Sequence, residues 1–344
     1  MFARLSDAQR VGQLFAVGLQ DDRLSSSEAG QIRRLHFGSV TFIETTSVGA
    51  SAIRDVSHAV QALATDKATG SVRFFVAANQ EGGLIQALRG PGFSRIPSAV
   101  VQGRMAVSDL RARASEWGRQ LLAAGVNLDF APVMDVVPPG ADEENEPIGV
   151  LQRGYGHDPN TVAKHGVAFL RGMERAGVAT TAKHFPGLGR VKGNTDFTAE
   201  VVDRTTTADD PYMDAFRDAI EAGVPFVMVA LATYTRIDPD HLAVFSQIIM
   251  EQLLRDKLQF TGVVVSDDLG EATAVAAIPP AQRAIDFLVA GGDMVVSKTV
   301  GPAEAMSRAI LSRVRTDASF RARVRDAVLR ILRAKGLSGL LPCG

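Results

Sequence analysis

The sequence of 344 residues contains one cysteine, one tryptophan and three tyrosines, and neither sign of charge is in excess. The single cysteine, Cys343, excludes an internal disulfide framework and a cysteine-based metal cluster. With 37 basic against 38 acidic side chains, the chain lacks the basic footprint that binding to a phosphate backbone requires. No apolar run approaches the ~20 residues that span a bilayer. We therefore expect neither a nucleic acid nor a membrane as a partner.

The first ten residues, MFARLSDAQR, lack the apolar core of a signal peptide. We therefore expect a cytoplasmic protein. A secreted protein that has lost its leader would begin in the same way, so secretion is the alternative. The oligomeric state is left open.

Short β-branched runs alternate with helical stretches along the chain. Each run is almost continuously apolar, which is typical of strands that are buried on both faces of a parallel sheet. The eight runs are residues 14–19, 39–43, 73–78, 127–133, 179–185, 226–231, 262–267 and 293–297. The length allows two domains, but eight strands alternating with helices favour one (β/α)8 TIM-type barrel domain over residues 1–344. No glycine-rich phosphate motif follows the first run, which disfavours a doubly wound dinucleotide-binding sheet.

The helical stretches carry recognisable ends. Residues 110–125 and 161–177 have helical periodicity and end in glycine, as helix C-termini often do. The tail, residues 301–337, predicts one or two arginine-rich amphipathic helices with a solvated outer face. Residues 135–152 predict a long polar loop after the fourth strand, where barrel enzymes build their active sites.

In such a barrel, polar residues that follow the strands gather at one mouth. Asp267 and Asp268 end the seventh strand, and because neighbours on a strand point to opposite sides, only one of them can face the mouth. A carboxylate held there is a candidate nucleophile or base. The other candidates are Asn79 to Gly83 after the third strand, Asp129 and Asp135 from the fourth, Lys183 to Gly189 from the fifth, and Lys298 after the eighth.

Several of these residues also have a purely structural interpretation. Asp129, inside an apolar strand, is expected to be a buried, hydrogen-bonded carboxylate, and Glu81 is expected to cap a following helix. The histidines other than His184 are expected to lie at the surface or in packing contacts. No two histidines have a metal-ligand spacing such as HExxH, so we predict no metal site and no cofactor. Lys183 has two chemical interpretations, a sugar-hydroxyl ligand beside His184 or a Schiff-base lysine.

Five segments together resemble glycoside hydrolase family 3, in its single-domain β-N-acetylhexosaminidase branch. They are NQEGGLIQAL (79–88), GVNLDFAPVMDV (125–136), QRGYGHDP (152–159), AKHFPGLGRVKGNTDF (182–197) and FTGVVVSDDLG (260–270). The resemblance extends from about Leu5 to Leu332, and its most specific part is KHFPG followed by SDDL at this spacing. It implies a (β/α)8 barrel and a retaining, two-step hydrolysis of glycosidic bonds without a metal.

The resemblance also implies roles for individual residues. Asp267 matches the nucleophile that forms the glycosyl-enzyme, while Lys183 and His184 match residues that bind sugar hydroxyls. Arg153 matches an arginine of the substrate-holding loop, and Asn79 stands where the family usually has an aspartate that grips the sugar. Retaining hydrolysis also needs a proton donor ~5–5.5 Å from the nucleophile. We expect Lys183 to help keep Asp267 ionised.

The chain departs from the family where the proton donor should lie. Family members usually read KHFPGHG followed by DSH, whose histidine is the acid/base, but this chain has Leu188 in the first motif and Asn194, Thr195 and Asp196 in the second. Asp196 would then act as a carboxylic acid with a raised pKa. The alternative is a pseudoenzyme that binds a saccharide or a partner without turnover.

Other changes affect specificity and motion. Asn79 replaces an aspartate of the family, and Leu84 and Ala87 replace two arginines, which indicates a changed sugar or aglycone preference. The glycines between 187 and 193 are expected to leave the loop mobile enough to close over a substrate. We expect a retaining, exo-acting glycoside hydrolase of a small saccharide or glycan, with Asp267 and Asp196 as its catalytic pair.

Overall fold

Eight parallel strands close into one barrel in the computed structural model, which describes residues 1–20 and 22–342. Cys343 lies outside the described residues. Around the barrel, each strand neighbours the next one in the chain, and the last pairs with the first. The strands are β1 (Phe15–Leu19), β2 (Ser39–Phe42), β3 (Phe75–Ala78), β6 (Leu128–Asp129), β7 (Ala179–Phe185), β9 (Phe226–Val229), β12 (Val263–Asp268) and β13 (Met294–Ser297). The predicted (β/α)8 barrel is confirmed, with all eight strands inside or within one residue of the predicted runs.

The strands form where they do because their apolar residues have no exposed face. Strands β1, β2, β3, β9 and β13 are buried at every residue. Strand β6 is shorter than predicted, since regular pairing ends at Asp129 and Pro132 has no amide hydrogen to donate to a ladder. The chain nevertheless continues beside β7, where Val133 forms a bridge with Lys183. This contact brings the segment after β6 to the end of β7.

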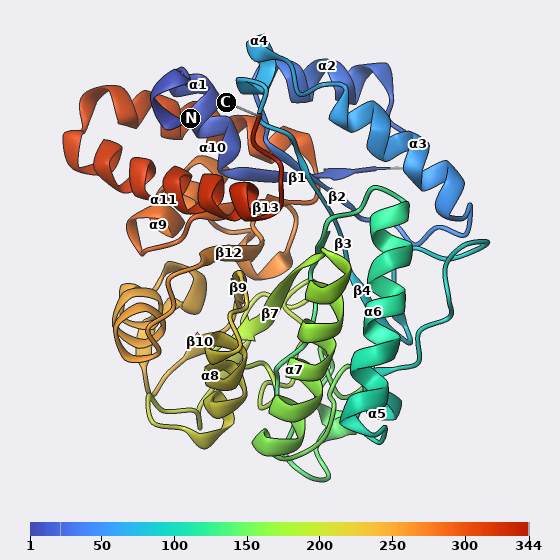
Figure 1. Ribbon diagram of the computed structural model, residues 1–344. Helices are drawn as coiled ribbons and strands as arrows, with labels where there is room; N and C mark the ends of the chain where they lie inside the picture. The colour runs from blue at the N-terminus through green and yellow to red at the C-terminus, as the bar shows by residue number, and fades with distance from the viewer. Residues whose placement is uncertain (21, 343–344) are drawn as a thin grey trace.

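Helices surround the strands, as Figure 1 shows. The α-helices are α1 (Asp7–Gln13), α2 (Ser26–Leu35), α3 (Ala50–Gln61), α4 (Asp66–Thr69), α5 (Ala99–Gln102), α6 (Val107–Ala123), α7 (Pro159–Ala176), α8 (Asp214–Glu221), α9 (Pro280–Val289), α10 (Val300–Thr316) and α11 (Ala318–Leu337), and η5 (Ile248–Lys257) is a π-type helix. The two helices predicted from periodicity are α6 and α7. Gly177, in the left-handed conformation, caps α7 as expected. None of the described helices is long and apolar enough to cross a bilayer.

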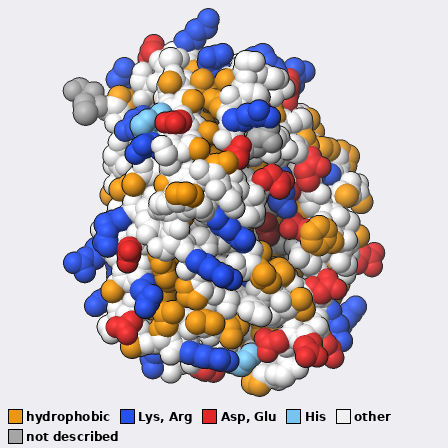
Figure 2. Space-filling view, turned by 90° about the vertical axis from the view of Figure 1, so that its right-hand side faces the viewer, with side chains coloured by type: hydrophobic (Ala, Val, Ile, Leu, Met, Phe, Trp, Pro, Cys, Tyr) orange, Lys and Arg blue, Asp and Glu red, His pale blue; other side chains and the backbone are white. Residues whose placement is uncertain are grey.

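The arginine-rich tail forms α10 and α11, which pack against α1 and bring the two ends of the chain together (Figure 1). The expectation of a solvated arginine face is only partly correct. Arg323 and Arg330 of α11 both reach Asp293, a fully buried residue just before β13. Elsewhere the surface carries charges of both signs scattered over the visible face (Figure 2), in keeping with the balanced composition.

The loops at the carboxyl ends of the strands are long and partly structured. After β3 the chain forms a hairpin of β4 (Gln80–Gly82) and β5 (Ile85–Gln86). A small sheet of β8 (Val202–Asp203), β10 (Thr233–Tyr234) and β11 (Asp238–Leu242) follows β7 and β9. Residues 135–152 are largely irregular, as predicted, with one short 3-10 turn at Asp142–Glu144. These loops enclose the mouth of the barrel.

Candidate active site

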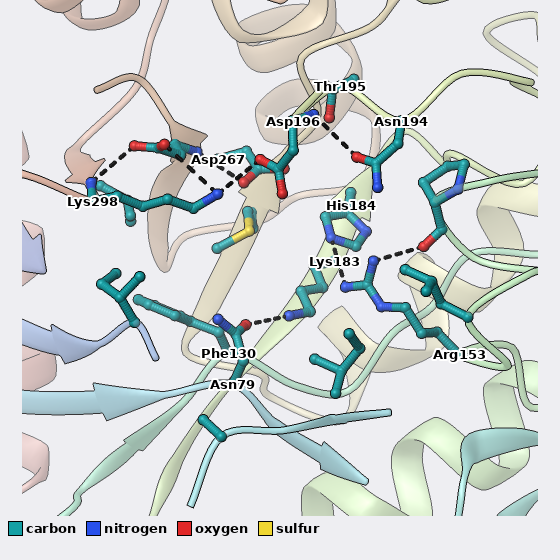
Figure 3. Close-up of a pocket in the computed structure, with 18 of the residues that line it drawn as sticks. Asn79, Phe130, Arg153, Lys183, His184, Asn194, Thr195, Asp196, Asp267 and Lys298 are labelled. Carbon is teal, nitrogen blue, oxygen red and sulfur yellow. Dashed lines mark hydrogen bonds and ion pairs between the residues drawn. The ribbon is translucent and has the colours of Figure 1, made fainter. Parts of the chain in front are cut away.

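A cavity of about 260 Å³ opens at the carboxyl ends of the strands. Its volume lies near the lower end of the roughly 300–1,000 Å³ found for small-molecule sites. The structure brings all six residues predicted for the site to its wall: Asn79, Arg153, Lys183, His184, Asp196 and Asp267. Figure 3 shows Asn79, Lys183 and Arg153 on one side, Asp196, Asp267 and Lys298 on the other, and His184 between them. Phe130 and Met228 add apolar surface.

Glu81 is the carboxylate that organises one side of the cavity. Arg153 donates to both of its oxygens through Nε and Nη2, each at 2.8 Å, and Lys183 Nζ lies 2.6 Å from Oε1. Burial raises the pKa of Glu81, but the two cations outweigh this effect and bring the pKa to about 2. The expectation that Glu81 caps a helix is wrong, because the residue lies in β4 and a hairpin follows it.

Lys183 is buried and holds two acceptors at once. Besides Glu81, its Nζ donates to Asn79 Oδ1 at 2.8 Å (Figure 3). Burial lowers the pKa of the Lys183 ammonium, and the Glu81 carboxylate opposes that effect. The carboxylate that pairs with Lys183 is therefore Glu81, which corrects the expectation that this lysine serves Asp267.

His184 is oriented by Asp135, which the sequence placed at the mouth without a role. Its Nδ1 lies 2.7 Å from Asp135 Oδ2, and its backbone N–H points to the same carboxylate. Leu188 N–H donates to Asp135 Oδ1 at 2.7 Å, so the carboxylate also holds the start of the next loop. With Nδ1–H donating to Asp135, Nε2 is left as an acceptor 3.3 Å from Arg153 Nη2. The ring is thereby fixed at the cavity wall.

The two aspartates at the end of β12 face different environments, as the alternation of strand side chains predicts. Asp267 is half-buried and lines the cavity, with one oxygen accepting the N–H of Asp268 at 2.8 Å. Asp268 is 1% exposed and accepts backbone N–H groups from Gly270, Glu271 and Lys298. Burial raises the pKa of Asp268, and these donors oppose the rise. Asp267 is thus the carboxylate available to a ligand.

Asp196 reaches the cavity from the loop after β7. Its backbone N–H donates to Asn194 Oδ1 at 3.0 Å, and its carboxylate Oδ1 accepts a hydrogen bond from Lys298 Nζ at 2.9 Å. The segment 195–196 also accepts the N–H groups of Thr273 and Ala274 through its carbonyl groups. Lys298 follows β13, and the sequence predicted only that it lies at the mouth. Its contact with Asp196 could not be predicted, because the two residues are 102 positions apart in the chain.

The start of this loop is packed rather than free. Leu188 is 1% exposed. A Cβ atom on Gly189 would lie 1.8 Å from the carbonyl oxygen of Val136, so a glycine is needed there for close packing. Mobility of the later part of the loop stays a prediction.

Asp129 lies behind the site, in β6. It is fully buried and its Oδ1 accepts the N–H of Gln80 at 2.9 Å, as expected for a structural carboxylate. Its Oδ2 has no hydrogen-bond partner among the described residues. Burial raises the pKa of Asp129 to about 7, with a smaller contribution from Glu81. A protonated Asp129 adds no negative charge beneath the cavity.

Comparison with known proteins agrees with the motifs. A model of the glycosyl hydrolase family 3 N-terminal domain matches residues 8–334. A β-hexosaminidase of Vibrio cholerae serotype O1 (strain M66-2) is 40% identical over 224 residues, which are 64% of this chain and 64% of that protein. A β-hexosaminidase of Xanthomonas oryzae pv. oryzae (strain KACC10331 / KXO85) is 31% identical over 293 residues, 82% of this chain and 83% of that protein.

The fold of a solved relative also extends over nearly the whole chain. The crystal structure of a β-N-acetylhexosaminidase from Beutenbergia cavernae DSM 12333 superimposes with a TM-score of 0.94 at 47% identity. The match covers 96% of this chain and 99% of that one. The resemblance drawn from the five motifs is therefore confirmed at the level of the family: the chain belongs to glycosyl hydrolase family 3, through the N-terminal domain of that family.

Proposed function

We propose that this chain, as a single barrel domain over residues 1–344, is a retaining, exo-acting glycoside hydrolase of the β-N-acetylhexosaminidase type. The observation that carries the proposal is the placement of Asp267 and Asp196 on the wall of one cavity, opposite a cluster of buried cations and amide groups. Two carboxylates around a glycosidic bond are what retaining hydrolysis requires. The names of the relatives support β-linked N-acetylhexosamine as the sugar.

In the first step, Asp267 attacks the anomeric carbon and forms a glycosyl-enzyme, while Asp196 gives a proton to the departing oxygen. In the second step, Asp196 takes a proton from a water molecule that attacks the same carbon, and the bond to Asp267 breaks. The acid/base loop is thereby altered relative to the family pattern, since a carboxylate does the work of a histidine. Asp196 is at the cavity wall, as this role demands.

The opposite wall binds the sugar. Lys183 lines the cavity while Glu81 and Asn79 fix its ammonium. Arg153 is locked by two hydrogen bonds to Glu81, and His184 by Asp135. Side chains that are held before the ligand arrives lose little conformational freedom on binding, which improves orientation of the reacting carbon. The same contacts disfavour Lys183 as a Schiff-base nucleophile. If borohydride traps no adduct between the chain and a carbonyl substrate, Schiff-base chemistry on Lys183 is excluded.

A mechanism-based label tests the nucleophile. Incubation with a 5-fluoro N-acetylhexosaminide or a 2-deoxy-2-fluoro glucoside that carries a good leaving group, followed by digestion and mass mapping, should place the label on the peptide that carries Asp267. A label on another peptide would refute the covalent step on this residue. A panel of aryl glycosides with different sugars, assayed beside the Asp267→Asn variant, gives the sugar preference.

A second experiment tests the proton donor. Asp196→Ala should slow substrates with poor leaving groups far more than aryl glycosides with good ones, because a good leaving group needs little protonation. Equal losses on both would remove Asp196 from this role. Saccharide binding without turnover across the whole panel would instead support a pseudoenzyme.

A further inference from the structure

Lys298 occupies a fixed position next to Asp196, the acid/base residue of the proposed reaction. Its backbone N–H donates to Asp268 Oδ1 at 2.9 Å, and its carbonyl oxygen accepts from Gln20 Nε2 at 2.6 Å. A Cβ atom on Gly18 would lie 2.2 Å from that carbonyl oxygen, so the neighbouring strand approaches the lysine backbone closely. The residue is therefore anchored at the ends of β12 and β13, on the rigid part of the barrel.

The side chain of Lys298 leaves this anchor and reaches the loop. Its Nζ lies 2.9 Å from Asp196 Oδ1 and 3.8 Å from Asp268 Oδ2. The contact with Asp196 is marked in Figure 3. Among the described residues, Lys298 is the one hydrogen-bond donor to the Asp196 carboxylate. The Lys298 ammonium thus links the loop after β7 to the end of β12, the strand that bears Asp267.

The state of the ammonium fits such a link. Burial lowers the pKa of Lys298, but the carboxylates of Asp196, Asp268 and Asp267 outweigh this effect and raise the pKa above its ordinary value. The group therefore stays charged. The side chains of Lys298 and Asp196 are 35% and 37% exposed. A pair this open to solvent contributes little to the stability of the fold. We therefore look for the role of this ion pair in the position that it gives to the Asp196 carboxylate.

We propose that Lys298 is a positioning residue that holds Asp196 as an oriented carboxylate, ready to activate water in the second step of the reaction. This inference rests on the proposed function. The second step needs the Asp196 carboxylate placed toward the attacking water, and the anchored ammonium 2.9 Å from its Oδ1 fixes that placement. Release of the glycosyl-enzyme is therefore the step that depends on Lys298.

The kinetics of Lys298→Met on an activated aryl glycoside test the assignment. With such a substrate kcat reports breakdown of the glycosyl-enzyme and kcat/KM reports its formation. We expect kcat to fall by about tenfold, less than the roughly 10²–10⁴-fold effect of an acid/base group itself, with KM falling in parallel and kcat/KM nearly unchanged. Added azide should restore kcat, because it attacks the anomeric carbon, releases Asp267 as a carboxylate, forms a glycosyl azide and needs no base. Lys298→Arg should recover part of kcat without azide.

Lys192→Met is the matched control. Lys192 lies on the same loop and pairs with Glu144 at 2.7 Å, but both side chains are more than two-thirds exposed and lie outside the cavity wall. This variant should keep the kcat and KM of the unaltered chain. Loss of kcat and kcat/KM by the same factor in Lys298→Met, with no rescue by azide, would overturn the inference.

A measurement that does not depend on turnover separates this inference from the proposed function. Hydrogen exchange of residues 190–198 reports the loop directly, since the N–H groups of Asp196, Phe197 and Thr198 all bond to Asn194. Exchange in this segment should accelerate in Lys298→Met and not in Lys192→Met. If the unaltered chain hydrolyses no glycoside, the proposed function is refuted. The exchange measurement then still decides whether Lys298 positions the loop. Unchanged exchange in Lys298→Met would refute the positioning role.

Discussion

The two ends of the barrel both bury charged side chains, but they use them differently. At the mouth, Glu81 pairs with Arg153 and Lys183, and the three groups lie beside a cavity. At the base, where the strands begin, Asp293 receives Arg255 from η5 and Arg323 and Arg330 from α11. Buried ions need partners at either end, because removing them from water is costly.

A second pair of residues sharpens the contrast. Lys183 at the mouth and Lys335 at the base are both almost fully buried. Lys183 meets a carboxylate, whereas Lys335 donates to Gln13 Oε1 and to the carbonyl oxygens of Gly38 and Arg73. Those three acceptors precede β1, β2 and β3, so one amino group ties the last helix to the start of three strands.

Burial of a charged side chain therefore does not by itself indicate a ligand-binding site. The base uses its ions to join segments that are far apart in the chain, and the mouth holds its ions beside space that a ligand can fill. Substitution of a group that faces the cavity, such as Asp267, should therefore reduce activity more than stability, and substitutions at the base should do the reverse. Glu81, buried behind the cavity wall, should contribute to both. The two sets of variants separate these effects.

Asp267→Asn is the variant with the largest expected effect. Loss of the nucleophile should lower kcat by on the order of 10⁴-fold, as for other groups that act directly in a covalent step. The midpoint of thermal unfolding should hardly change, since Asp267 is half-buried and its carboxylate accepts a hydrogen bond from the N–H of the next residue, Asp268. Aryl-glycoside kinetics and calorimetry on the same preparation measure both. A large drop in thermal stability would break the proposed contrast.

Asp293→Asn should show the opposite behaviour. Removing one partner of a buried ionic cluster costs roughly 3–5 kcal/mol of unfolding free energy, because the arginines are left without their counter-charge. The kcat at a temperature where the protein is folded should stay unchanged. Denaturant unfolding gives the free energy, and Arg330→Met, at the most exposed of the three arginines, should cost less. Equal costs for the two variants would contradict the ranking by burial.

Glu81→Gln tests the mouth for a stability contribution that depends on pH. The pKa of Glu81 in the fold is about 2 against an ordinary value of 4.5, so its ionisation stabilises the fold above pH 4.5. The lowered pKa corresponds to about 3 kcal/mol of unfolding free energy, and this contribution is lost as the pH falls from 4.5 toward 2.

The difference in unfolding free energy between the unaltered chain and Glu81→Gln should therefore shrink over that acid window. Saccharide binding at neutral pH should weaken as well, because Arg153 and Lys183 lose the group that fixes them. Denaturant unfolding at several pH values and calorimetric titration with a sugar check the two effects. A difference that is constant from pH 6 to 2 would contradict the ionic account.

The sequence predicted most of the fold because barrel strands carry a local signal. Continuous apolar runs and glycines at helix ends depend on neighbours in the chain, and all eight strands and the two periodic helices were found from them. Strand β6 was overextended, since the apolar run continues past the point where Pro132 interrupts pairing. The site residues Asp267, Lys183 and His184 were accessible because they follow strands and lie in motifs.

The partners of those residues were not accessible from the sequence. Glu81 precedes two glycines and was assigned to a helix cap, although its partners are 72 and 102 positions away. The contact of Lys298 with Asp196 and the burial of Lys335 depend on the same long-range geometry. Spacing along the chain predicts which residues reach the mouth, whereas which cation meets which carboxylate is decided by packing in three dimensions.

Lys335→Met has the smallest expected effect and tests the base without a carboxylate. The substitution leaves three acceptors without their donor but also removes an amine that is costly to bury, so we expect a net loss of about 1 kcal/mol at neutral pH and unchanged kcat. Burial lowers the pKa of Lys335 well below 10.5, so the unfolded chain binds a proton that the folded chain resists. The stability of the unaltered chain should then rise as the pH rises toward 10.5, and the cost of Lys335→Met should be greatest there. Denaturant unfolding between pH 7 and 10.5 measures this slope. A cost that instead shrinks as the pH rises would mean that folding raises the pKa of Lys335, which would contradict this account.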